Sequence, residues 1–215
     1  MPRSCEYLIA NTTGASNQDK TSEQPQEREG NQMPVYLIRH GQSEFNAAHN
    51  AGDKDPMIFD APLTDEGRRQ AEEAKALVAG LGIKQVITSP LTRAIQTALC
   101  IFDNITPISV AARHRELLIH SCDVGRPPGD LQRDFPTLSF EHLPDHWWHQ
   151  GPENDDGIAV EPLDVFLKRI DAFERSLAQI KDRPLAIVGH GNAFKALTGQ
   201  MMDNCEILRY HPGKS

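Results

Sequence analysis

The sequence has few of the features that mark disulfide-rich, metal-binding or membrane-spanning proteins. Its 215 residues contain four scattered cysteines, and none belongs to a CxxC pair. Such spacing is not typical of a disulfide framework or a zinc site, so we expect free thiols and no bound metal. No apolar run approaches the ~20 residues of a membrane span. The apolar stretch near the start is too short for a secretory signal, so a cytoplasmic location without a membrane partner is expected.

Positive charge is also scarce. Lysine and arginine number 22 against 30 aspartates and glutamates, which gives a formal net charge of -8. This balance argues against a general nucleic-acid or membrane-surface binder. It does not exclude an anionic small-molecule substrate, because cations focused in one cleft can still attract it.

Composition distinguishes an N-terminal extension from a folded domain that contains an insertion. Residues 1–32 are polar and lack apolar periodicity, which predicts a disordered N-terminal extension. Residues 33–212 form the predicted folded domain. Within it, residues from about 120 to 160 are rich in Gly and Pro and contain Trp147 and Trp148, which indicates a long insertion with one short helix near Asp130–Phe135. The tryptophan pair is expected to pack this insertion onto the domain.

Short apolar runs alternate with amphipathic segments along the domain. The runs begin near residues 35, 85, 107, 184 and 207, and helices are expected after most of them, for example from Thr64 to Gly82. A longer helix at 161–180 carries Val165, Phe166 and Ile170 on its predicted apolar side. This order predicts an α/β fold, a three-layer sandwich with a mostly parallel sheet and helices on both faces.

The first strand ends in Arg39-His40-Gly41. Arg39 and His40 have side chains that can bind or attack a phosphate group, and Gly41 tolerates most backbone conformations. Open α/β sheets bind ligands at such strand ends. Arg39 offers a fork of donors that suits phosphate oxygens, and the neutral imidazole of His40 is a nucleophile. Asn46, about two turns into the helix expected next, adds an amide.

Two later stretches repeat this architecture. Gly189-His190-Gly191 follows another buried strand, and Ser89 is followed by Arg93 at the start of a helix. If the strands are neighbours, two imidazoles and two guanidiniums converge at one edge of the sheet. Such a cluster can neutralise a phosphoryl dianion and attack its phosphorus, so the sequence predicts a phosphoryl-transfer pocket.

These motifs together resemble the histidine phosphatase superfamily, in its phosphoglycerate mutase-like branch. The resemblance is carried by residues 37–46 (LIRHGQSEFN), 63–71 (LTDEGRRQA), 89–98 (SPLTRAIQTA) and 188–192 (VGHGN). It implies a phosphoglycerate mutase-like fold and a phosphohistidine on His40. The site residues that it implies are His40 as nucleophile, Arg39, Arg93 and His190 on the phosphoryl oxygens, Asn46 in support, Gly41 at a close turn, Glu116 as proton donor and Asn192 on the substrate.

The chain departs from the mutase pattern after Glu116. Mutases carry there a signature that grips the three-carbon substrate, and residues 117–126 lack it, which favours hydrolysis of small phosphomonoesters without a cofactor. The same departure keeps Asp123 open as an alternative donor, and Arg126 either reads a second anionic group or pairs with an acid. Mutase-type transfer and a non-catalytic phospho-ligand-binding protein are the alternative functions. The oligomeric state is open, with a homodimer as one option.

Overall fold

The computed structural model describes residues 34–103 and 105–213, so the prediction for the extension at 1–32 lies outside the described part. A five-stranded sheet with the order β3-β2-β4-β1-β5 forms its centre. The strands are β1 (Val35–Arg39), β2 (Gln85–Thr88), β3 (Ile108–Val110), β4 (Leu185–Gly189) and β5 (Ile207–Tyr210). Only the β1–β5 pair is antiparallel among these. The mostly parallel sheet is therefore confirmed.

Strand register brings the motif-bearing ends together. β1 and β4 pair in parallel with Arg39 opposite Gly189, so His40 and His190 each come directly after a paired residue. The amide of His40 donates to the Gly189 carbonyl over 2.9 Å. Ser89 follows β2, and its backbone amide donates to the Val188 carbonyl over 3.1 Å. Three strand ends that are far apart in sequence are thus adjacent.

One face of the sheet is covered by α5 (Leu163–Leu177) and α6 (Gly191–Thr198). Side chains of β1 and β4 point to this face at alternate positions, as the pleat requires. The helical side chains that pack on them are Phe166, Ile170, Phe173, Leu177, Phe194 and Leu197. Val165 was wrongly placed in this set, since it is 39% exposed; it lies one position before Phe166 and so points away from the sheet.

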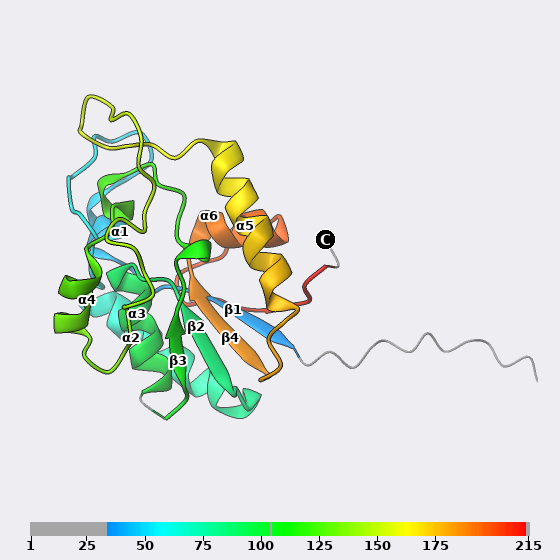
Figure 1. Cartoon of the computed structure of the whole chain (residues 1–215). Helices are drawn as coiled ribbons and strands as arrows, with labels where there is room; N and C mark the ends of the chain where they lie inside the picture. Colours follow the sequence, from blue (N-terminus) through cyan, green and yellow to red (C-terminus); the bar gives the residue numbers. More distant parts are fainter. Residues whose placement is uncertain (1–33, 104, 214–215) are drawn as a thin grey trace, which may run out of the picture. The chain divides into compact units, whose positions relative to one another are not determined.

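The opposite face is covered by α2 (Asp65–Val78) and α3 (Thr92–Phe102). Thr64 caps α2 as its sequence indicates, because its side chain accepts from the amide of Gly67. The short 3₁₀ helix η1 (Ala79–Leu81) continues α2 to Gly82, whose φ of +62° ends it. Figure 1 shows the sheet between these helix pairs, so the three-layer arrangement is confirmed.

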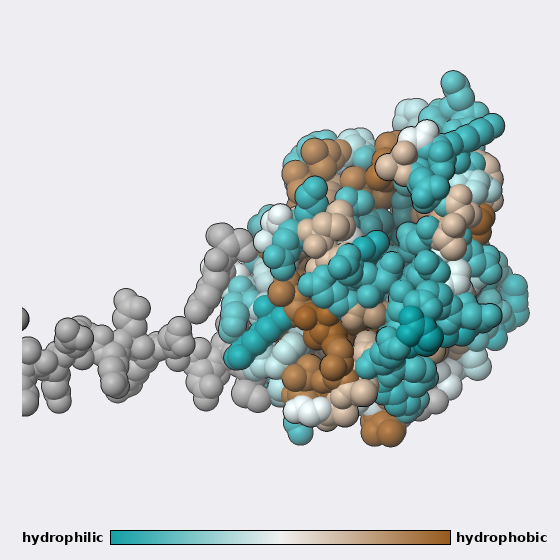
Figure 2. Space-filling model, turned by 180° about the vertical axis from the view of Figure 1, so that it is seen from behind, coloured by the Kyte–Doolittle hydropathy of each residue, from teal (hydrophilic) through white to brown (hydrophobic). Residues whose placement is uncertain are grey.

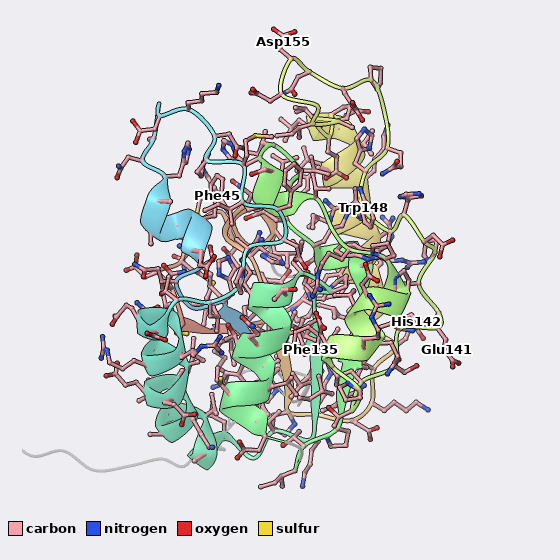
Figure 3. All side chains as sticks on the ribbon, turned by 90° about the vertical axis from the view of Figure 1, so that its left-hand side faces the viewer. Phe45, Phe135, Glu141, His142, Trp148 and Asp155 are labelled. Carbon is pink, nitrogen blue, oxygen red and sulfur yellow. The ribbon has the colours of Figure 1, made fainter. Side chains whose placement is uncertain are left out.

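The remaining short elements lie in the connections. They are α1 (Glu44–Ala48), η2 (Ala112–His114), η3 (Ser121–Asp123) and α4 (Pro128–Asp134). The segments around residues 50–60 and 150–160 rise at the end of the molecule that also carries α1 (Figure 1). In Figure 3, Asp155 marks the tip of the second segment, while Phe45 lies lower, next to the first.

The 120–160 insertion has a core of its own against α3. Trp147 is buried, donates its indole N–H to the Arg126 carbonyl over 2.9 Å, and meets Trp148 edge-on. It packs in one cluster with Leu91 and Ile95 of the α3 start. Figure 3 shows Trp148 and Phe135 on this side of the molecule. The tryptophan pair therefore has the structural role expected from the sequence.

The outer surface is mixed in character. Figure 2 shows a mostly hydrophilic rear face with separate hydrophobic areas. Among residues 34–103 and 105–213, no helix has the length and apolar character needed to cross a bilayer.

Candidate active site

His40 sits at the end of β1 with its ring almost fully buried, at 3% exposure. Its Nδ1 lies 2.7 Å from the carbonyl oxygen of Gly41. A carbonyl can only accept, so Nδ1 carries the proton and Nε2 keeps its lone pair. Burial, together with the positive charges of Arg93 and Arg39, holds the pKa of His40 well below its usual 6.5. The ring is therefore a neutral imidazole with Nε2 as the nucleophilic atom.

His190 lies beside it as the N-cap of α6. The two ring centroids are 5.2 Å apart, and His190 is fully buried. Burial and the charge of Arg93 lower its pKa well below the usual value. Within the described residues neither ring nitrogen of His190 has a hydrogen-bond partner. A buried polar atom without a partner costs about 1–3 kcal/mol, so these nitrogens are suited to receive a ligand.

Arg93 comes from the first turn of α3 and is 3% exposed. Its Nε donates to Nε2 of His40 over 3.2 Å, which agrees with the lone pair placed there. Its Nη1 donates to the carbonyl of Cys122 over 2.6 Å, and its Nη2 pairs with Asp123 over 2.9 Å. The guanidinium is thus fixed with one edge against the nucleophilic nitrogen.

Arg39 is held from the other side. Its Nη1 donates to the Met202 carbonyl over 2.5 Å, whereas its buried Nε has no partner among the described residues. That Nε lies next to Gly191, because a Cβ on this glycine would come within 3.5 Å of it. The second guanidinium therefore borders the start of α6, next to His190.

Glu116 approaches the same helix start. Its Oε2 accepts from the backbone amide of Asn192 over 3.1 Å, and its Oε1 accepts from the amide of Leu117. Burial, and next the negative charge of Asp123, raise the pKa of Glu116 to about 7. A large fraction of this carboxyl group is therefore protonated at neutral pH, as a proton donor requires.

Asp123 is bound differently. One oxygen pairs with Arg93, and the other accepts from the backbone amides of Ile119 and His120. Asp123 therefore holds the Arg93 guanidinium, whereas the two oxygens of Glu116 accept from backbone amides. The two carboxyl groups that the sequence left as alternative donors thus have different partners, an arginine for Asp123 and two amides for Glu116.

Gly41 is required for a reason other than the expected turn. A Cβ at this position would lie 2.5 Å from the carbonyl oxygen of Gly67. A Cβ on Gly67 would lie 2.1 Å from the carbonyl oxygen of Gln42. The two backbones touch, so both positions exclude a side chain. This contact packs the start of α2 directly on the turn that carries His40.

The two predicted amide residues both lie at helix starts, and Asn46 lies nearer to the start of its helix than expected. Asn46 lies in the first turn of α1, because that helix is only five residues long, and its Oδ1 accepts from the amide of Ser43. Its side chain is exposed and caps its own helix. Asn192 lies at the α6 start, where its backbone amide contacts Glu116.

Arg126 does not reach the catalytic cluster. It pairs with Asp60 over 2.7 Å and with Asp134 over 2.6 Å, which favours the acid-pairing alternative. Thr97, on the other hand, escaped the sequence reading. Its hydroxyl accepts from the amide of Gly41 over 3.1 Å and donates to the Arg93 carbonyl. Its spacing of four residues from Arg93 on one helix face was the available signal.

The arrangement has the parts of a phosphoryl-transfer centre. A neutral imidazole presents a lone pair, two guanidiniums and a second imidazole surround it, and a largely protonated carboxyl group lies at the same helix start. Fixed cations can offset the charge on the equatorial oxygens of a phosphoryl group during in-line attack.

Residues 35–211 match the family model of the histidine phosphatase superfamily (branch 1). The chain is 28% identical to a glucosyl-3-phosphoglycerate phosphatase of Mycolicibacterium vanbaalenii over 81% of this chain and 78% of that protein. It is 26% identical to phosphoglycerate mutase-like protein 1 of Arabidopsis thaliana, covering 80% and 72% respectively. A mycobacterial glucosyl-3-phosphoglycerate phosphatase solved with VO3 shares the fold at a TM-score of 0.54 and 21% identity, over 83% of this chain and 90% of that one.

Proposed function

Because the chain belongs to the histidine phosphatase superfamily (branch 1), we propose that it is a metal-independent phosphatase that hydrolyses phosphomonoesters of small metabolites. The observation that carries the proposal is the neutral, buried imidazole of His40, whose Nε2 faces the guanidinium of Arg93 and lies beside the unpartnered ring of His190. The similarity to a named glucosyl-3-phosphoglycerate phosphatase supports hydrolysis as the reaction.

In the first step Nε2 of His40 attacks phosphorus and the bond to the leaving oxygen breaks. The incoming phosphoryl group takes the place of Nε2 as the acceptor of the Arg93 Nε–H. Arg39 Nε and His190 provide further donors for its oxygens. Glu116 gives its proton to the departing alkoxide, and the product of this step is a phosphohistidine and a free alcohol.

In the second step a water molecule attacks the phosphohistidine. The Glu116 carboxylate left by the first step accepts the water proton, the P–N bond breaks, and inorganic phosphate leaves. The Gly41 carbonyl keeps the proton on Nδ1 throughout, so Nε2 regains its lone pair. Gly41 and Asn192 serve this cycle through their backbone contacts at the His40 turn and at the Glu116 carboxyl group, while Asn46 caps the helix that follows His40.

The direct test is turnover of p-nitrophenyl phosphate in EDTA, with His40→Ala and, as a matched control, His146→Ala. His146 is an exposed imidazole in the insertion, so its loss should leave the rate unchanged. We expect His40→Ala to lower kcat at least ~1,000-fold and to abolish radiolabelling of the protein by a ³²P-phosphomonoester. Equal activity of wild type and His40→Ala, or no label on His40 in a quenched reaction, would refute the proposal.

Phosphoglycerate mutase-type transfer is the second candidate, favoured by the similarity to a phosphoglycerate mutase-like protein. Interconversion of 2- and 3-phosphoglycerate without release of phosphate would establish it in place of hydrolysis. A non-catalytic phospho-ligand-binding role would instead require phosphate-ester binding by wild type with no turnover of any ester in a broad panel.

We further propose that the protein acts in the cytoplasm on small phosphorylated substrates. The thiols of Cys100, Cys122 and Cys205 are free, which suits a reducing compartment. Recovery of the protein from an extracytoplasmic or membrane fraction would contradict this location. Sedimentation equilibrium would decide between a monomer and a homodimer.

A further inference from the structure

Arg169, a half-buried arginine of α5, contacts the backbone of Glu116. The side chain of Arg169 is 10% exposed and pairs with Glu161, whose side chain is fully buried. Its Nη2 and Nε donate to the two carboxylate oxygens over 2.6 and 3.0 Å, which is bidentate pairing. Arg115 adds a third charge to this group, 3.1 Å from Glu161.

The rest of the Arg169 guanidinium is aimed at backbone carbonyls. Its Nη1 donates to the carbonyls of Arg113 and Arg115 over 2.8 and 2.9 Å, and its Nη2 donates to that of Glu116 over 3.2 Å. One side chain therefore fixes three carbonyls in the short segment that ends at the proposed proton donor. The planar fork of arginine suits this task, whereas a lysine could reach only part of the set.

The same segment is anchored at two further points. The amide of Glu161 donates to the carbonyl of Leu118 over 2.8 Å. The buried ring of His114 lies 3.1 Å from the Val188 carbonyl of β4 and stacks on Phe173 of α5. Residues 113–118 are thus held on both sides of Glu116, and its carboxyl group has little freedom to move.

Stability alone is a weak reason for such an arrangement. Buried ion pairs often contribute no more to folding than well-packed apolar side chains would, because desolvation offsets their attraction. Arg175, on the exposed side of the same helix, shows what an ordinary arginine of α5 does, since it pairs only with Asp171. Position, rather than folding energy, is what the Arg169 hydrogen bonds define.

We propose that Arg169, held by Glu161, is a positioning residue that aims the carboxyl group of Glu116 at the leaving oxygen of the substrate. The proposal rests on the proposed phosphatase function and extends it to residues that touch neither substrate nor phosphorus. The Arg169–Glu161 pair, here called the α5 clamp, then determines where the Glu116 proton is delivered. Binding of the phosphoryl group by His40, Arg39 and Arg93 does not depend on this clamp.

Two substrates separate these roles. p-Nitrophenolate leaves as a stable anion without help, whereas the alkoxide of β-glycerol phosphate needs a proton as it departs. A misplaced Glu116 should therefore lower kcat/KM, which reports phosphohistidine formation, far more for the alkyl ester than for the aryl ester. A general loss of structure, or damage to the phosphoryl pocket, should slow both equally.

The experiment compares Arg169→Lys with Arg175→Lys on both substrates, with Glu116→Gln as the reference for a lost donor. We expect Arg169→Lys to lower kcat/KM for β-glycerol phosphate ~10–100-fold and for p-nitrophenyl phosphate less than ~3-fold. The basic limb of the pH–rate profile of Arg169→Lys should also move, because the surroundings of the Glu116 carboxyl group change. Arg175→Lys should match wild type, and Glu116→Gln combined with Arg169→Lys should add little to Glu116→Gln alone.

Each outcome has a separate meaning. If Glu116→Gln lowers kcat/KM equally for both substrates, Glu116 is not the donor in phosphohistidine formation and the proposed mechanism fails. If Glu116→Gln is selective but Arg169→Lys slows both substrates equally, or neither, the clamp does not position the donor. If Arg169→Lys does not fold, Glu161→Gln, which keeps the shape of the pair, must show the same selectivity to a smaller degree, and its absence overturns the proposal.

Discussion

Burial decides the protonation state of each reacting residue. His40 and His190 lie in a site with two guanidiniums, so taking on a proton is doubly unfavourable and both pKa values fall. Glu116 is a carboxyl group near another carboxylate, so the same burial raises its pKa to about 7. One environment therefore favours a neutral imidazole on His40 and a largely protonated carboxyl group on Glu116 at the same pH, as attack with proton donation requires.

Asp123→Asn tests this electrostatic coupling. The negative charge of Asp123 opposes ionisation of Glu116, so its removal should lower the pKa of Glu116 and move the basic limb of kcat/KM to lower pH. Loss of the partner of buried Arg93 should also cost about 3 kcal/mol of unfolding free energy. Both effects are measured on one preparation, by a pH–rate profile and by urea denaturation.

Asp171→Asn is the control for this prediction, because its pair with Arg175 is exposed and it should change neither quantity appreciably. The outcome also separates the two candidate donors. A loss of β-glycerol phosphate turnover at every pH, with p-nitrophenyl phosphate turnover kept, would make Asp123 the donor and remove Glu116 from that role.

Among elements, the contact between the β1–α1 turn and the start of α2 positions the nucleophile. Gly41 and Gly67 allow these backbones to touch, and the amide of Gln42 donates to the Gln70 side chain of α2. The carbonyl of Gly41 orients His40, so a displaced turn would also release the ring. The packing of α2 therefore helps to position the candidate active site. Among the described residues, no α2 side chain forms a hydrogen bond with His40.

Gly67→Ala should accordingly destabilise the fold by about 2–3 kcal/mol, as overpacking does, and lower kcat by displacing the His40 turn. Gly129→Ala in α4 is the matched control, since a Cβ there meets nothing within 4 Å. That control should be neutral or stabilising by about 0.5–1 kcal/mol. Urea denaturation and p-nitrophenyl phosphate turnover check both variants, and equal behaviour of the two would contradict the close-contact argument.

For the whole domain, stability should depend on pH through its buried titratable groups. Burial lowers the pKa of His114 to about 4, while the unfolded chain titrates near 6.5. Between these values the unfolded state binds a proton that the folded state does not, so stability falls as pH decreases. From pH 6.5 to 5 this one residue should cost roughly 2 kcal/mol. Glu116 acts in the opposite direction between its ordinary 4.5 and about 7.

A variant isolates the His114 contribution from the others. His114→Leu should lower stability at pH 7.5, because the Val188 carbonyl loses one of its two hydrogen bonds and keeps that from the Ser89 amide. It should also reduce the proton uptake on unfolding near pH 5.5 by about one proton relative to wild type. Denaturation curves at several pH values give this slope, with His146→Ala as the exposed-histidine control. An unchanged slope in His114→Leu would show that His114 titrates normally in the folded protein.

The sequence determined the order of elements and the residues that stand at the strand ends. Alternating apolar runs predicted the mostly parallel sheet and placed His40 and His190 at strand ends, and the parallel pairing of β1 with β4 in the structure met the condition for bringing them together. Thr64 and Gly82 marked the limits of α2 and its 3₁₀ continuation because capping depends on neighbours in the chain. Such local rules depend on a few neighbouring residues, so they can be applied to the amino-acid sequence alone.

Tertiary structure decided what each side chain does once it is buried. The sequence could not distinguish Glu116 from Asp123, because only long-range packing gives Asp123 an ion pair with Arg93 and raises the pKa of Glu116. It gave Gly41 a turn role, whereas the contact with Gly67, 26 residues away, explains the glycine. It did not foresee Arg169 at all. Protonation, pairing and close approach depend on which atoms exclude water from one another, and that is fixed only when distant segments meet.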